Sequence, residues 1–339
     1  MGAPVSAGFD LEALQAWLAQ ALGCGRRIAR VTKLGGGAIQ ENWRLDFADG
    51  QPLVLRTEAV STVPLSRGKA EEFAIHARVF AQGLTVPRPL ALCAESQVIG
   101  RLFYLMEWRP GEARGRTLVL DPEIDRWGPP LARRLGEECA RLHRLAPPLA
   151  ELGFLAPPEA NPAQARVRAY RRHLAERAVQ NPVLDLALAW LDANAPEPGH
   201  LALVHGDLRT GNYLVHQGIL SAILDWEFAD IGDPLEDLGW FLVRYWRFGR
   251  WHAEAGALGP KSALLEGYRE AGGVLPDDPA VLTYWQLMGT VRWAVIALMQ
   301  AERHDQEGEP SLDLALTGAV LPQLEWDILD LIEVLDGAR

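Results

Sequence analysis

Lysine, cysteine and long apolar runs are all scarce in this chain. Of its 33 basic residues only three are lysines, so almost every positive charge is an arginine. The three cysteines, Cys24, Cys93 and Cys139, lack the spacing of a metal-binding motif, which favours a reduced, cytoplasmic protein. No run of about 18 apolar residues occurs, and residues 1–9 show no basic-then-apolar pattern. We therefore expect neither a membrane span nor a secretory signal.

Positive charge is also outnumbered by negative charge. Acidic residues exceed basic ones by 44 to 33, and the formal net charge is −11 at pH 7. A chain of this sign is not expected to bind nucleic acid. Its 339 residues, 49% of them apolar, exceed what one hydrophobic core usually serves. Two lobes are therefore expected.

The most informative stretch runs from Leu201 to Trp240. Two strand-like apolar runs there enclose a polar loop, in which Asp207 is followed by Asn212 five positions later. A second acid, Asp225, follows the next apolar run after a Gln-Gly turn. An ordinary solvated loop with Asp and Asn as turn formers is the simpler alternative. The combined spacing instead favours the catalytic loop and metal-binding Asp of kinases.

Each polar residue type in this stretch suits phosphoryl transfer. Asp207 would accept the proton of an attacking hydroxyl group. Asn212 and Asp225 would supply oxygen ligands to a magnesium ion on the phosphates. We expect His205 to orient the loop backbone and not to contact substrate.

These residues carry a family resemblance. His205-Gly206-Asp207 with Asn212 matches the His-Gly-Asp-x-x-x-x-Asn loop of the aminoglycoside phosphotransferase and choline kinase superfamily. The segment from Asp233 to Leu238 matches its Asp-Pro-x-x-Asp-Leu motif. The chain is most similar to the phosphotransferase-like domains related to those fused to acyl-CoA dehydrogenases. The resemblance implies ATP or GTP as phosphate donor, magnesium as cofactor and a hydroxyl group as acceptor.

The N-terminal part reads as a nucleotide-binding lobe. A helix is expected from Leu11 to Leu22, and strands are expected at 28–34, 41–47 and 53–56. Gly35, Gly36 and Gly37 lie between the first two strands, where backbone N–H groups could close over phosphates.

An arginine stands where the superfamily usually has a lysine. Arg56 ends the third strand, and we expect it to hold the phosphates and to pair with a Glu of the helix over residues 70–82. Glu72 fits the family pattern better than Glu71. The alternative is that both acids simply favour the helix N-terminus. The exchange of lysine for arginine also raises the possibility of a nucleotide-binding pseudokinase without turnover.

The resemblance also implies the domain boundaries. Residues 1–106 would form the nucleotide-binding lobe, 107–111 the hinge, and 112–339 a mostly helical lobe. A strand pair is expected at 97–99 and 102–108, followed by the hinge, where backbone groups of Met106, Glu107 and Arg109 would contact the adenine. The expected fold is α+β and bilobal, like a protein kinase, with an antiparallel sheet in the N-lobe.

The C-terminal part has helical periodicity. Helices are expected near 131–145 and at 162–179, 182–193, 238–248, 262–271, 279–304 and 312–335. Arg292 stands within the apolar helix 279–304, and a buried arginine requires a partner, either a structural carboxylate or an anionic substrate group. The segment from Arg126 to Arg177 is rich in arginine. These arginines either cover solvated helix faces or line a site for an anionic acceptor.

The acceptor is expected to be small. Gly206 stands where protein kinases have an arginine, and only seven residues separate Asp225 from Asp233, too few for a peptide-docking segment. The sequence therefore predicts a monomeric or homodimeric kinase of a small-molecule hydroxyl, with an aminoglycoside or an anionic compound as acceptor. A metal hydrolase that uses His205, Asp207 and Asp225 fits poorly, because no second histidine clusters with them unless His216 is recruited.

Overall fold

The computed structural model describes residues 9–23, 25–35, 41–48, 50–58, 66–305 and 311–337. The chain forms two compact units. The first unit comprises Met1–Arg114, Ala150–Phe154 and Gly211–Ala229. The second comprises Gly115–Leu149, Leu155–Thr210 and Asp230–Arg339. The lobe boundaries and the hinge at 107–111 remain predictions.

An antiparallel sheet forms the centre of the first unit. Its strand order is β1-β2-β3-β5-β4. The bounds are β1 Ile28–Leu34, β2 Glu41–Phe47, β3 Leu53–Thr57, β4 Pro89–Cys93 and β5 Phe103–Glu107. A separate hairpin of β7 (Tyr213–His216) and β8 (Ile219–Ile223) also belongs to this unit.

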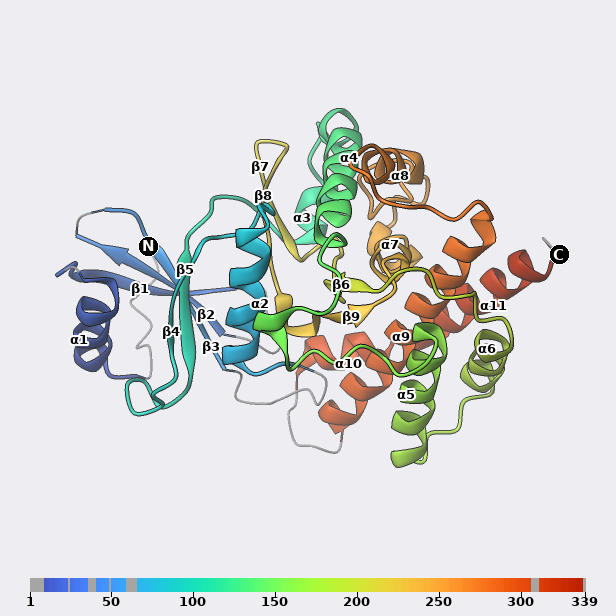
Figure 1. The fold of residues 1–339 in the computed structure, drawn as a ribbon, viewed down its shortest axis with the longest axis horizontal. Helices are drawn as coiled ribbons and strands as arrows, with labels where there is room; N and C mark the ends of the chain where they lie inside the picture. Colours follow the sequence, from blue (N-terminus) through green and yellow to red (C-terminus); the bar gives the residue numbers. More distant parts are fainter. Residues whose placement is uncertain are drawn as a thin grey trace. The chain divides into compact units, whose positions relative to one another are not determined.

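Helices cover both faces of the sheet, because its central strands alternate two apolar sets. Leu55 of β3 and Leu105 of β5 join the core cluster that includes Leu14 of α1 (Leu11–Leu22). Val54 and Met106 belong to the cluster on the opposite face. There α2 (Lys69–Ala81) packs against β4 and β5, and Figure 1 shows α1 and α2 on either side of the sheet.

The predicted start and end of α1 are confirmed. The Asp10 carboxylate accepts hydrogen bonds from the backbone N–H groups of Glu12 and Ala13, at 2.8 and 3.1 Å. Gly23 ends the helix with a left-handed φ of 62°, a conformation that glycine adopts without steric cost.

The predicted strand at 97–99 is wrong. This segment forms a turn, and the partner of β5 is instead β4, which begins at Pro89. Val98 and Ile99 are buried in the core cluster below the sheet, so their apolar character reflects packing and not strand pairing. Short apolar runs do not distinguish these two cases.

The second unit is mostly helical. Its helices are α3 Gly115–Val119, α4 Ile124–Leu142, α5 Pro162–Glu176, α6 Pro182–Ala193, α7 Leu235–Phe241, α8 Lys261–Glu270, α9 Pro279–Asp305, α10 Leu312–Gly318 and α11 Leu321–Gly337. Helix α9 packs against α7, α10 and α11, and α4 packs against α8 (Figure 1). Two short strands, β6 (Ala202–Val204) and β9 (Asp230–Gly232), pair antiparallel beside them.

Three helix predictions need correction. The helix expected near 131–145 is α4, which begins at Ile124 and ends at Leu142. The predicted helix 312–335 is two helices, because Pro322 lacks the N–H group that a helix interior requires and can occupy only the first turn of α11. The predicted helix 238–248 begins at Leu235, ends at Phe241 and continues as a short 3-10 turn, Arg244–Arg247. The α+β class, with a sheet-containing N-terminal part and a helical C-terminal part, is confirmed. Among the described helices, none is long and apolar enough to cross a membrane.

Candidate active site

A buried group of charged side chains in the first unit is centred on Glu72. Arg56 and Tyr104 are opposite each other on β3 and β5, so both side chains lie on the face covered by α2. Glu72, on the first turn of α2, accepts hydrogen bonds from Arg56 Nε at 2.6 Å and from Tyr104 Oη at 3.1 Å. Lys69, the first residue of α2 and three positions before Glu72, pairs with the other carboxylate oxygen. The neighbouring Glu71 is half exposed and lies near Arg67 instead.

Burial and charge act in opposite directions on this group. Burial alone would raise the pKa of Glu72, but the positive charges of Arg56 and Lys69 outweigh it and lower the pKa to about 2. Burial lowers the pKa of Lys69, against the attraction of Glu72. Glu72 is therefore ionised at neutral pH and pairs with two cations, whereas a carboxylate in an ordinary ion pair has one.

The far end of Arg56 extends to the metal motif. Its Nη1 donates to Asp225 Oδ1 at 2.7 Å, and Asn42 Oδ1 lies 3.4 Å away. Its Nη2 is buried and has no hydrogen-bond partner within the described part of the chain. A buried guanidinium N–H without an acceptor is costly, so this nitrogen is a ready donor to a ligand oxygen.

The hairpin β7–β8 brings Asn212 and Asp225 together. The backbone N–H of Leu224, beside Asp225, donates to the carbonyl of Asn212 at 2.9 Å. Asp225 has a left-handed φ of 63°, rare for a residue with a side chain, and its side chain is 30% exposed. Two residues on, Glu227 is buried, and this burial raises its pKa to about 7.

The second unit holds the Asp207 part of the loop. Asp237 of α7 accepts the backbone N–H groups of His205 and Gly206, at 2.7 and 2.9 Å, and its carboxylate lies 3.1 Å from His143 Nε2. Burial alone would raise the pKa of Asp237, but the hydrogen bond and charge of His143 hold it below its usual range. Gly206 has a φ of +74°, which glycine adopts readily. Asp237 thus fixes the backbone directly before Asp207.

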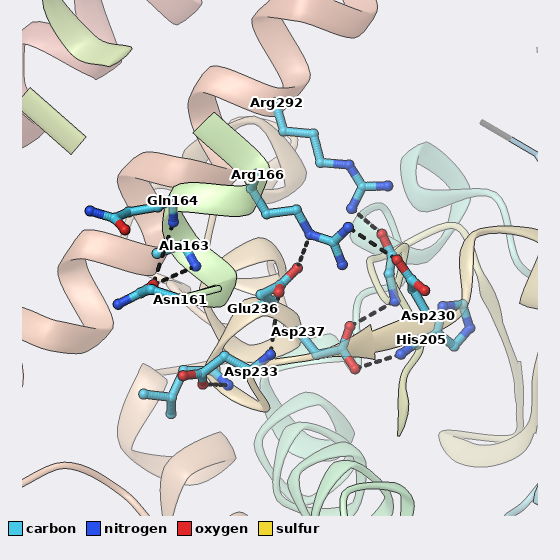
Figure 2. A network of polar contacts seen from close by, with 12 residues as sticks. Asn161, Ala163, Gln164, Arg166, His205, Asp230, Asp233, Glu236, Asp237 and Arg292 are labelled. Carbon is cyan, nitrogen blue, oxygen red and sulfur yellow. Dashed lines mark hydrogen bonds and ion pairs between the residues drawn. The ribbon is translucent and has the colours of Figure 1, made fainter. Parts of the chain in front are cut away.

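The Asp207 carboxylate has two donors on one oxygen. Trp240 Nε1 lies 3.0 Å and Arg209 Nε 3.2 Å from Asp207 Oδ1. The Asp207 backbone N–H donates to His205 Nδ1 at 3.1 Å, so the His205 ring contacts the loop backbone. Figure 2 shows His205 and Asp237 side by side, with the ion pairs of Arg166 to Asp230 and Glu236 next to them.

The remaining predicted residues are less constrained. Gly35 is exposed, while Gly36 and Gly37 lie outside the described residues. The backbone N–H of Glu107 donates to the carbonyl of Arg88, and its side chain pairs with Arg109 at 3.1 Å. Met106 of β5 is buried on the face of the sheet that α2 covers. Their proposed contact with adenine remains a prediction.

Sequence analysis did not assign Lys69, Tyr104, Glu227 or Trp240 to the site. Lys69 had a signal, because a residue three positions before Glu72 on a helix lies on the same face. For Glu227 the sequence signal was its place in the triplet Asp-Trp-Glu. Tyr104 and Trp240 had none, because aromatic residues in apolar runs are usually core residues.

A known protein family matches most of this chain. The model of the phosphotransferase enzyme family matches residues 30–281, well over half of the chain. The chain belongs to this family. It is 31% identical over 247 residues to human acyl-CoA dehydrogenase family member 11, covering 70% of this chain and 31% of that protein. It is 27% identical over 263 residues to mouse family member 10, covering 74% and 22%. The chain thus spans less than a third of the length of these relatives.

Solved structures show the fold of this phosphotransferase family member. A structure from Ralstonia eutropha matches with a TM-score of 0.75 and 22% identity, covering 94% of this chain and 96% of the other. A choline/ethanolamine kinase family protein from Mesorhizobium loti matches at 0.64 and 19%, covering 95% and 94%. Macrolide 2′-phosphotransferase from Brachybacterium faecium matches at 0.58 and 22%, covering 92% and 98%. The predicted kinase-like fold and family resemblance are confirmed.

A buried histidine beside the Glu72 group leads to a stability prediction. His76 is buried one turn after Glu72, and burial lowers its pKa to about 4 from 6.5. The unfolded chain therefore binds this proton first, and the folded state loses stability as pH falls from about 6.5 to 4. The loss approaches about 3 kcal/mol, at 1.36 kcal/mol per pKa unit.

Urea denaturation at pH 7.5, 6.0 and 5.0 measures this loss. His76→Gln should show a flatter dependence than the wild type over this range. His252→Gln, at an exposed histidine, should follow the wild type. Equal slopes for His76→Gln and the wild type would show that His76 does not titrate in this way. Glu227, whose pKa is raised to about 7, gains stability as pH falls through the same range. It is present in both proteins, so the difference in slope between the wild type and His76→Gln reports His76.

Proposed function

We propose that this protein transfers the γ-phosphate of ATP or GTP to a hydroxyl group of a small molecule, with magnesium. The observation that carries the proposal is the pair of ion pairs Glu72–Arg56 and Arg56–Asp225 in the first unit. It ties the predicted phosphate-binding arginine to both the helix Glu and the predicted metal ligand, as phosphoryl transfer requires. Family membership and the Asp207 loop support the same function.

The residues present fit a magnesium–nucleotide group. Arg56 Nη2 is the buried donor for a phosphate oxygen. Asn212 and Asp225 offer only oxygen atoms, the ligands that magnesium prefers. When bound, the ion neutralises charge on the transferred phosphate. Lys69 and Tyr104 hold Glu72, which in turn holds the Arg56 side chain in place.

Asp207 supplies the base. In the proposed reaction its carboxylate accepts the proton of the acceptor hydroxyl while that oxygen forms a bond to the γ-phosphorus. The bond from the γ-phosphorus to the leaving ADP oxygen breaks. Trp240 and Arg209 both donate to Oδ1, and these two hydrogen bonds hold the carboxylate in place.

A small acceptor is supported by the short path after Asp225. The chain passes through one 3-10 turn and the three-residue β9 before α7 begins at Leu235. An activation segment has no place in this path. Transfer to a protein is therefore not proposed.

The arginine-rich segment is weaker evidence for an anionic acceptor than the sequence suggested. Several of its arginines pair with carboxylates: Arg126, Arg133, Arg134, Arg141, Arg166, Arg171 and Arg177. Arg209, next to Asp207, remains as the cation best placed to favour an anionic acceptor. An aminoglycoside is the alternative.

A screen for phosphate transfer tests the function. Labelled ATP or GTP is offered with aminoglycosides, choline-like amines, sugars and hydroxyacyl thioesters. Transfer to a hydroxyl compound supports the proposal, and the compound shows the charge preference. Tight binding of Mg-ATP without transfer to any acceptor, or to water, would instead favour the pseudokinase alternative.

The metal assignment gives a separate prediction. Asp225→Ala should abolish the magnesium dependence of ATP binding, because it removes the charged metal ligand. Since the variant also removes a partner of Arg56, Asp225→Asn is the matched variant that keeps an oxygen for Arg56 Nη1. Both should lose magnesium-dependent binding in titration calorimetry, and the exposed Asp277→Ala should not. Equal affinity of the wild type for ATP with magnesium and with EDTA would contradict the assignment.

A further inference from the structure

Arg292 is a charged residue in the middle of the apolar helix α9. The sequence predicted a carboxylate or a substrate anion as its partner. Its Nη1 donates to the backbone carbonyl of Gly206, the residue before Asp207. Its guanidinium carbon also lies 4.7 Å from the ring centroid of Trp240, within the range of a cation–π contact. Figure 2 shows this side chain extending toward the segment that holds His205.

Both contacts of Arg292 lead to Asp207. Gly206 is held on both sides, since its N–H donates to Asp237 and its carbonyl accepts from Arg292. The Trp240 ring that Arg292 covers donates its Nε1–H to Asp207 Oδ1 at 3.0 Å. One guanidinium therefore contacts both the backbone before Asp207 and the indole that binds the Asp207 carboxylate.

Helices α7 and α9, which carry Trp240 and Arg292, are in close contact. A Cβ added at Gly239 of α7 would lie 2.4 Å from the Trp285 backbone of α9. A Cβ at Gly289 of α9 would lie 3.0 Å from the Val243 side chain. Trp240 is buried and packs edge-on against Trp246, with ring centroids 5.1 Å apart. The indole consequently has little room to turn away from Asp207.

We propose that Arg292 is a positioning residue for Asp207. It orients the carboxylate through the Gly206 carbonyl and through Trp240, and it contacts neither nucleotide nor acceptor. The inference rests on the proposed function, in which Asp207 accepts the hydroxyl proton. A displacement of a reacting group by about 1 Å can cost about 100-fold in rate, so loss of Arg292 should lower kcat and leave the KM for ATP unchanged.

Two readouts test the inference. The first is the indole Nε1–H signal of Trp240 in protein labelled at tryptophan nitrogen, identified by its absence in Trp240→Phe. The second is ADP formation from Mg-ATP with water as the acceptor, which does not require the acceptor to be known. Circular dichroism and the thermal midpoint report whether each variant is folded.

The variants separate positioning from simple packing. Arg292→Met keeps a long side chain and should lower kcat by about tenfold or more, with the KM for ATP within about twofold of wild type. It should also shift the Trp240 indole signal. Arg292→Lys should recover part of kcat, since an ammonium can still donate to the Gly206 carbonyl. Trp240→Phe, which keeps a ring but loses the donor, should lower kcat similarly. Arg269→Met, at an exposed arginine of α8, is the control.

Several outcomes would overturn the inference. If Arg292→Met lowers only the thermal midpoint, with kcat and the Trp240 signal unchanged, the residue is purely structural. Should Arg292→Met fail to fold, an unchanged kcat in both Arg292→Lys and Trp240→Phe would have the same meaning. Failure of the proposed function looks different, because either the wild type would then show no turnover or Asp207→Asn would keep the wild-type turnover. The indole signal tests the contact in either case.

Discussion

Asp207→Asn is expected to lower kcat by about 100-fold or more while ATP affinity stays near the wild-type value. The reason is that a positioned general base contributes about 10²–10⁴ in rate. Asparagine keeps an oxygen that can accept from Trp240 Nε1 and Arg209 Nε, so the loop should keep its shape. The effect would then report the lost base and not a rearranged loop.

The measurement is steady-state phosphate transfer to the acceptor found by screening, together with calorimetric ATP binding. Asp207→Ala should be at least as slow, and a change in its ATP affinity would reveal any effect on loop shape. Near-normal turnover of Asp207→Asn with the true acceptor would remove Asp207 from the role of base.

Arg56→Ala is expected to weaken ATP binding or turnover by at least about tenfold. Charge-assisted hydrogen bonds of a guanidinium to phosphate are each worth about 1.5–3 kcal/mol, and about 1.4 kcal/mol corresponds to one decade. The structure adds that Arg56 holds Glu72 and Asp225 at once. Arg56→Lys should restore only part of the activity, because a single ammonium replaces the planar fork.

Lys69 is the competing cation and provides the matched control. It pairs with the second oxygen of Glu72, while Arg56 and Tyr104 bind the first. Lys69→Ala should therefore have a smaller effect than Arg56→Ala, since Glu72 keeps two partners. The opposite order, with full activity in Arg56→Ala and loss in Lys69→Ala, would make Lys69 the phosphate anchor. The thermal midpoint of each variant shows whether its activity is lost only because the protein is unfolded. Arg56→Lys remains informative if Arg56→Ala is unstable.

Much of the secondary structure followed from local pattern. The strands Ile28–Leu34 and Glu41–Phe47 and the helix Pro182–Ala193 have the bounds that alternation, helical spacing and turn residues predicted. Errors arose where packing or proline decided the outcome, as at 97–99 and at Pro322.

Sequence alone determined the family, the fold class and the candidate loop, because these depend on residue types at short spacings along the chain. The order of His205, Asp207, Asn212 and Asp225 is visible without coordinates. Only the tertiary structure showed which charges share a partner. The contact of Arg292 with Gly206 joins residues 86 positions apart. No local periodicity encodes such a contact, since it depends on how α9 packs against the helix that holds the loop.

The same distinction applies to Glu72. Its place on a helix after the third strand could be predicted, and its helical spacing from Lys69 was visible. It was not predictable that Lys69 and Arg56 would both be buried and would both pair with the Glu72 carboxylate. Burial is a property of the packed sheet and helix. It lowers the pKa of Lys69, whereas Glu72 stays ionised because the charges of Arg56 and Lys69 outweigh its own burial.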